Sequence, residues 1–200
     1  MVAAKVYVEG GGTANALRSA CREGFSALFD KAGLRGRMPR VVVSGSRAEA
    51  YKRFCTAFSS SAPDEFICLL VDSEGPVPAG SSPWLLLGTR PPGAADDNAH
   101  LMVQCMEAWF LADADALEGY FGQGFRGSAL PNRTDVDNIP KRDVFAALER
   151  ATCACAPKGQ YKKGAHSFKV LATLDPDKVA QASPYARRLF DTLKQKTQGT

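Results

Sequence analysis

Three acidic residues, Glu9, Asp72 and Glu74, stand where apolar stretches of the sequence end. Glu9 follows KVYV, and the other two come directly after FICLLV. Carboxylates that lie close together raise each other's pKa, and a cation among them relieves the repulsion. Carboxylate oxygens without a nearby histidine or thiolate favour a hard divalent ion such as Mg²⁺ or Mn²⁺, which leaves positions for water and substrate phosphate. Brought together by the fold, the three residues predict a metal site for phosphate chemistry. The alternative is that they are solvated strand ends.

The stretches around these residues predict an α/β fold. Apolar, β-branched runs predict strands over 5–9, 40–45 and 66–72. Between them, helical spacing begins after Thr13 and after Ser46, and both residues are expected to cap a helix. This alternation is typical of a mostly parallel sheet flanked by helices. Ligands of such sheets bind outside the carboxyl ends of the strands, where the acidic residues stand.

The rest of the chain predicts a fourth strand over 101–105, a short helix after it, and a helical carboxy-terminal lobe. Pro140, Asp175-Pro176 and Ser183-Pro184 each mark the start of a helix. We expect an α/β domain over 1–125 and a helical extension over 126–200 that packs on it, with a single domain as the alternative.

Glu107, in QCMEAWFLAD, is a fourth acidic candidate. If the fourth strand lies beside the others, its carboxylate reaches the same crevice. It could equally serve the start of the helix there, because negative charge suits a helix amino terminus. Trp109 is expected in the core, and Asp113 is expected to act as a local cap.

Two segments are candidates for binding substrate phosphate. The first is the glycine-rich turn after Glu9, although it lacks the spacing of a Walker phosphate loop. The second is the basic segment KGQYKKGAHSFK, whose cations would hold phosphate and whose Tyr161 could stack on a base. The alternative for this segment is a solvated basic loop. The phosphate-binding candidates are Gly10, Gly11, Gly12, Thr13, Lys162, Lys163, His166 and Lys169.

The motifs VYVEGGGT and LLVDSEG resemble the glutamate and aspartate motifs of the Toprim domain, which topoisomerases, primases and several nucleases share. Glu74 replaces the second aspartate of that pattern. With MEAWFLAD and YKKGAHSFK, most of the chain also resembles a Toprim-like bacterial family of unknown function, domain-of-unknown-function family 4276.

This resemblance implies a Mg²⁺-dependent (or Mn²⁺-dependent) phosphoesterase of nuclease type, in which Glu9, Asp72, Glu74 and Glu107 are the catalytic candidates. Glu9 would be a general acid/base or a metal ligand, and Asp72 and Glu74 would hold the ion. It also implies a nucleic-acid substrate, DNA or RNA, an ATPase partner and a role in phage defence. The alternative is a non-catalytic nucleic-acid or partner-binding module on the same fold.

Composition is compatible with both functions. The net charge is +4 and the pI about 8.8, which allows a polyanionic partner without requiring one. No apolar run approaches the ~20 residues that span a bilayer, and the start of the sequence has no secretory pattern. The expected location is therefore cytoplasmic, with no membrane partner.

Overall fold

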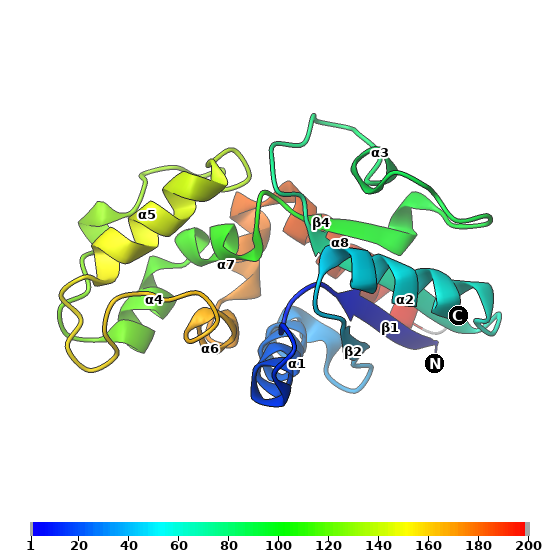
Figure 1. Ribbon diagram of the computed structural model, residues 1–200, viewed down its shortest axis with the longest axis horizontal. Coiled ribbons are helices and arrows are strands. Elements are labelled where there is room, and N and C mark those ends of the chain that lie inside the picture. The colour runs from blue at the N-terminus through cyan, green and yellow to red at the C-terminus, as the bar shows by residue number, and fades with distance from the viewer. Residues whose placement is uncertain (1, 199–200) are drawn as a thin grey trace.

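A computed structural model describes residues 2–198. Its centre is a four-stranded sheet with the order β2-β1-β3-β4, in which every neighbouring pair is parallel. The flanking helices and the parallel sheet confirm the α/β architecture expected from the sequence (Figure 1). The strands are β1 (Ala3–Val8), β2 (Arg40–Val43), β3 (Glu65–Asp72) and β4 (Ala99–Met102).

The central strand β3 is covered on both faces. All of its residues after Glu65 are buried, which explains why its sequence is apolar almost throughout instead of alternating. Helices α1 (Asn15–Phe29) and α8 (Pro184–Thr197) contribute to the core on one face, and α2 (Arg47–Ser59) and α3 (Trp84–Leu87) to that on the other. The sheet is thus held between two layers of helices. Functional groups can therefore be reached at the ends of the strands but not on the faces of the sheet.

Three of the four short η segments among residues 2–198 adjoin elements of the sheet layer. They lie after α1, before β4 and after β4, where a 3-10 helix carries Glu107 and the buried Trp109. Their bounds are η1 (Asp30–Leu34), η2 (Asp96–Asn98) and η3 (Met106–Ala112).

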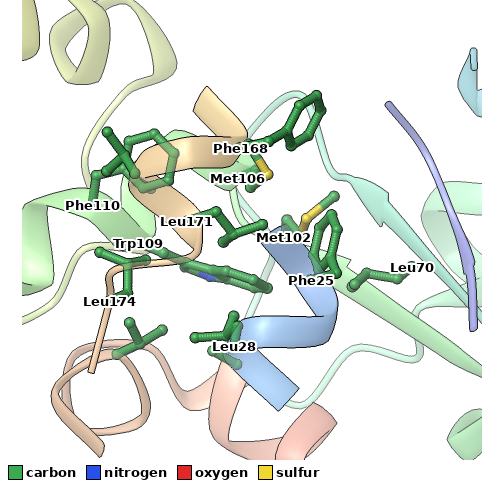
Figure 2. Packing of buried hydrophobic residues seen from close by; sticks show 14 of the residues in the cluster. Phe25, Leu28, Leu70, Met102, Met106, Trp109, Phe110, Phe168, Leu171 and Leu174 are labelled. Atoms are coloured by element: carbon green, nitrogen blue, oxygen red, sulfur yellow. The ribbon is translucent and has the colours of Figure 1, made fainter. Parts of the chain in front are cut away.

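The helical elements between η3 and α8 lie beyond the carboxyl ends of the strands (Figure 1). Their apolar residues belong to the same buried cluster as those of β1 and α1, so the core continues across the sequence position 125/126. In Figure 2, Trp109 packs between Leu28 of α1 and Leu171 of α6. These elements are α4 (Ala114–Phe121), η4 (Gly127–Ala129), α5 (Lys141–Thr152), α6 (Ser167–Leu171) and α7 (Pro176–Ala182).

Several predicted helix starts are confirmed. Ser46, Asp113, Asp175 and Ser183 each accept a hydrogen bond from a backbone N–H in the first turn of the helix that they precede. Thr13 is not a cap, and that prediction was wrong. Helix α1 is preceded by Ala14, which provides no side-chain acceptor.

The fourth strand begins two residues earlier than predicted and ends at Met102. Ala99 and His100 extend it at the start because they pair with Leu69 and Leu70 of β3. Apolar character continues past Met102 into η3, and hydrophobicity alone therefore did not mark where the strand ends.

From residue 2 to residue 198, the chain forms no helix with the length and apolar character needed to cross a bilayer.

Candidate functional site

A pocket of about 240 Å³ opens at the carboxyl ends of β1 and β3. Three acidic residues line it: Glu9 directly after β1, Asp72 at the last position of β3, and Glu107 in the first turn of η3. We call it the carboxyl-edge pocket. Its other walls come from the glycine-rich turn, α1, η3 and the segment that enters α6, through Gly10, Gly11, Gly12, Leu17, Gly45, Met102, Met106, Lys163, Gly164, Ser167 and Phe168.

Glu9 and Asp72 are linked directly. The backbone N–H of Asp72 donates to Oε2 of Glu9 over 3.1 Å, while the backbone N–H of Glu9 donates to the carbonyl oxygen of Leu70. The second bond continues the β1–β3 ladder by one residue and fixes the backbone of Glu9. The side chain is thereby held at the end of the neighbouring strand.

Asp72 is a buried carboxylate, with 7% of its surface exposed. Its Oδ1 accepts a hydrogen bond of 2.9 Å from the backbone N–H of Met106. Burial raises the pKa of Asp72 to about 7, and the negative charges of Glu107 and Glu9 add to that rise. The positive charge of Lys163 and the Met106 N–H act in the opposite direction. Asp72 therefore titrates near neutral pH.

The pKa of Glu9 is also raised. Partial burial is the largest cause, and the carboxylate of Glu74 adds repulsion. The N–H of Asp72, Arg47 and Lys141 offset part of this rise. Two neighbouring acids with raised pKa values in one pocket are the pattern expected of a functional site.

Glu107 is held by two hydroxyl groups. Tyr161 Oη and Ser167 Oγ each donate to its Oε1 over 3.2 Å, and the two hydroxyls lie 2.8 Å apart. Only 1% of Glu107 is exposed. Glu107 lies in the first turn of η3, where no side chain caps the helix, and its carboxylate lines the pocket with Glu9 and Asp72.

Glu74 does not line this pocket. It is exposed, has a positive φ of 65°, and forms an ion pair with Lys141, whose Nζ lies 2.5 Å from Glu74 Oε2. The same Nζ lies 4.0 Å from Asp72 Oδ2. Lys141 therefore places a positive charge between Asp72 and Glu74, two of the three carboxylates that the sequence predicts to bind a metal.

The backbone of the glycine-rich turn has positive φ at Gly10, Gly11 and Gly12, a conformation that favours glycine. Gly11 has φ +74°, and a Cβ atom there would meet Val43 Cγ1 at 2.5 Å. Gly10 and Gly45 exchange two backbone hydrogen bonds of 2.8 and 3.0 Å, which tie the turn to the chain after β2. Thr13 is exposed and lies outside the pocket lining.

Lys163 is the candidate lysine of the basic segment that reaches the pocket lining. The exposed Lys162 and Lys169 are not part of the lining, and neither is His166. His166 accepts a hydrogen bond from the Lys162 backbone N–H and packs its ring beside Phe121. The expectation of base stacking by Tyr161 was wrong, because its side chain is 3% exposed and fixed to Glu107.

Sequence reasoning missed Ser167, which lines the pocket, and Lys141, which lies beside Asp72 outside the lining. Both contact acidic candidates that are 60 or more positions away, Glu107 and Glu74. Local spacing carries no signal for such pairs. Ser167 did lie within a segment already singled out for its basic residues, YKKGAHSFK.

The donor set suits a partly hydrated divalent ion. Within residues 2–198, no three His, Cys, Asp or Glu side chains lie in an arrangement that could hold a metal by themselves. Glu9 and Asp72 nevertheless each use one oxygen for a backbone N–H, while Glu9 Oε1 and Asp72 Oδ2 accept no hydrogen bond from any described residue. Mg²⁺ is commonly bound through one or two carboxylates, with water and substrate phosphate completing the shell, so the pair fits such an ion.

Comparison with known proteins gives one match. No curated protein and no solved structure matches the chain significantly. The family described as "Domain of unknown function (DUF4276)" matches residues 8–194, a span that includes every lining residue of the carboxyl-edge pocket. The chain belongs to the DUF4276 family.

Proposed function

We propose that the protein is a Mg²⁺-dependent phosphoesterase of nuclease type that acts on nucleic acid. The observation that supports this most is the convergence of Glu9, Asp72 and Glu107 on one pocket beside a glycine-rich turn and Lys163. Three acids and one lysine give the pocket a negative character that a divalent ion would balance. The resemblance of VYVEGGGT and LLVDSEG to the Toprim motifs agrees with this reaction class.

Each side chain then has a defined task. A bound Mg²⁺ supplies Lewis acidity to a phosphoryl oxygen. Asp72 and Glu9 are the residues that would hold the ion, since each has one carboxylate oxygen that accepts no backbone N–H. With a pKa of about 7, Asp72 must lose its proton to bind.

Glu107, fixed by Tyr161 and Ser167, adds negative charge at the deep wall of the pocket. Lys163 lies at its rim, where an ammonium group positions a phosphodiester and offsets charge that develops on it.

A non-catalytic nucleic-acid or partner-binding module is the second candidate. The ion pair between Lys141 and Glu74 supports it, because the Lys141 ammonium already offsets negative charge beside Asp72. In this case Glu107 serves to hold Tyr161 and Ser167 against η3, and the basic segment alone contacts nucleic acid. Binding would then be independent of divalent ions.

The deciding experiment compares cleavage and binding in the same preparations. We expect tRNA, single-stranded DNA or plasmid to be cut in Mg²⁺ or Mn²⁺ and left intact in EDTA. Glu9→Gln and Asp72→Asn should each lower the rate at least about a hundredfold if both acids contact the ion. Asp64→Asn is the matched control, because Asp64 is exposed at the opposite end of β3.

Two outcomes would contradict the proposal that the protein is a nuclease. One is cutting that survives in both pocket variants. The other is tight nucleic-acid binding without cutting and without calorimetric heat from Mn²⁺, which would identify the binding module.

A further inference from the structure

Lys141 and Glu74 form an ion pair beside Asp72, and neither of the two lines the carboxyl-edge pocket. Lys141 Nζ lies 2.5 Å from Glu74 Oε2 and 4.0 Å from Asp72 Oδ2. Asp72 is thus shared: it lines the pocket with Glu9 and Glu107, and it also faces this ammonium group. The ammonium stands between two carboxylates that the sequence predicts to share a metal ion.

Gln104 holds both partners of this ion pair in place. Its side-chain Oε1 accepts a hydrogen bond of 3.1 Å from the backbone N–H of Lys141, at the start of α5. Its backbone carbonyl oxygen accepts one of 2.9 Å from the N–H of Glu74. Gln104 itself is buried. Because both backbones attach to one buried residue, the fold brings the lysine and the glutamate together, and their pairing does not depend on a chance contact of surface side chains.

Glu74 has a backbone conformation that is unfavourable for its residue type. With a φ of 65°, it is the only non-glycine residue with a positive φ between residues 2 and 198. Two contacts hold it there, the N–H bond to Gln104 and the ion pair with Lys141. Residues in such conformations persist only where their surroundings fix them, and they cluster at functional sites. The conformation of Glu74 therefore supports a functional role for its pair with Lys141.

Lys141 keeps its positive charge in this environment. Partial burial acts to lower its pKa, but the hydrogen bond to Glu74 and the negative charge of Asp72 act in the opposite direction, and the pKa is raised overall. The same charge offsets part of the rise in the pKa of Glu9. One built-in cation therefore acts on both Glu9 and Asp72, the residues that we assign to the divalent ion.

This cation stands where a second metal ion would need its ligands. Enzymes that use two metal ions on phosphate esters place the ions about 3.5–4 Å apart, and each ion needs oxygen ligands. Beside Asp72 and outside the pocket, the carboxylate that could serve a second ion is Glu74. Its Oε2 is already bound to Lys141 Nζ. An ammonium group thus occupies the place between Asp72 and Glu74.

We propose that Lys141 takes the place of a second metal ion, so that the protein binds one divalent ion, at Glu9 and Asp72. This inference rests on the proposed function, because it concerns the same ion. The ammonium supplies positive charge but no Lewis acidity. Lys141 is therefore a positioning residue, which acts through Asp72 and Glu74 and sets the number of ions that the carboxylates hold.

The test counts the Mn²⁺ ions bound by the full chain, by calorimetry and by electron paramagnetic resonance. We expect one ion per chain in the wild type and two in Lys141→Gln, because the substitution frees Glu74 Oε2. Two neighbouring Mn²⁺ ions give a spin-coupled spectrum, which should appear in Lys141→Gln and not in the wild type. Ions that Asp72→Asn still binds are adventitious and are subtracted. The control Lys52→Ala, on the exposed part of α2, should bind one ion.

A further substitution locates the second ion. Lys141→Gln combined with Glu74→Gln should return the count to one, because Glu74 is expected to be a ligand of the second ion only. A count that stays at two in this double variant would place the second ion elsewhere and overturn the proposal. If Lys141→Gln does not fold, Lys141→Met replaces it, since methionine keeps most of the length of the side chain without its charge.

The same measurements separate this inference from the proposed function. Two ions in the wild type, or a single ion in Lys141→Gln, would overturn the inference alone if the wild type still cuts nucleic acid in Mn²⁺ and Glu9→Gln does not. A wild type that binds no ion would overturn the inference and the proposed function together.

Discussion

The backbone N–H of Asp72 donates to the side chain of Glu9 across 3.1 Å, although 63 positions separate the two residues. This bond joins the ends of β1 and β3 and fixes one oxygen of Glu9. It leaves the other oxygen toward the carboxyl-edge pocket, where Asp72 and Glu107 also lie. The approach of Glu9 to Asp72 is therefore a product of parallel strand pairing.

Asp72→Asn should remove a pH-dependent loss of stability. With a pKa of about 7 in the fold and an ordinary value near 3.8 in the unfolded chain, the folded protein holds a proton at Asp72 between about pH 4 and pH 7. Stability therefore falls as pH rises through that window, by up to about 1.4 kcal/mol per unit. In urea unfolding from pH 4.5 to 8, the free energy of unfolding of the variant should increase relative to that of the wild type as pH rises. A parallel pH profile would contradict the burial argument, and Asp64→Asn should retain the wild-type slope.

Lys141→Gln should strengthen Mn²⁺ binding. The Lys141 ammonium lies 4.0 Å from Asp72 Oδ2, the oxygen that we assign to the ion, and like charges at such a distance repel. Calorimetry at low salt should show an affinity increase of about three- to tenfold. Lys52→Ala, a charge removal on the exposed part of α2, should leave the affinity unchanged. Weaker Mn²⁺ binding in Lys141→Gln would mean that Lys141 supports the site instead of competing for it.

Gly11→Ala and Gly12→Ala form a matched pair in the glycine-rich turn. Both positions have positive φ, but a Cβ at Gly11 meets Val43 at 2.5 Å, whereas at Gly12 the nearest atom is Leu17 Cδ2 at 3.7 Å. Gly12→Ala should cost about 1 kcal/mol of unfolding free energy from backbone strain alone. Gly11→Ala should cost about 2–4 kcal/mol because a clash is added. Chemical denaturation measures both, and equal losses would show that the turn relaxes freely around Gly11.

Tyr161→Phe and Ser167→Ala should each destabilise the fold by about 1–2 kcal/mol, because each removes one donor from the buried carboxylate of Glu107. Tyr120→Phe is the control, since no hydrogen bond of the Tyr120 hydroxyl is found among residues 2–198. The double variant should not be additive, because both hydroxyls contact the same Oε1 and each other. Thermal unfolding of these variants beside the wild type tests this. Strict additivity would indicate that water replaces the missing donors.

Replacing Lys162 and Lys163 with alanine should reduce the salt dependence of nucleic-acid binding. Removing one lysine–phosphate interaction makes the slope of log K against log salt shallower by about 1. Lys163 lines the pocket, and Lys162 is exposed next to it, so a decrease of about 2 is expected if both bind phosphate. Filter binding across a salt series measures the slope. An unchanged slope would exclude this segment from the interface.

The features that sequence could predict are those set by local chemistry. The run FICLLV predicted a strand covered on both faces, and Asp72 at its end followed from the same pattern. Ser46 and Ser183 signalled helix starts because a side-chain oxygen there satisfies a free backbone N–H. The resemblance to the DUF4276 family, confirmed over residues 8–194, rested on segments that contain lining residues of the pocket.

The features that sequence could not predict depend on distant contacts. Lys141 reaches Glu74, and Ser167 reaches Glu107, only once the lobe has packed beyond the strand ends. Tyr161 illustrates the same limit. An aromatic residue in a basic segment suggested an exposed ring, whereas the carboxylate of Glu107 draws its hydroxyl into the interior.

The site closes late during synthesis on the ribosome. Glu9 and Asp72 emerge early, but the wall formed by Lys163, Gly164 and Ser167 follows some ninety residues after Asp72. Helix α8, which covers one face of the sheet, is made later still. Translation therefore delivers the acidic residues well before the enclosure that buries them, and a nascent chain stalled before α6 would carry these acids without a working pocket.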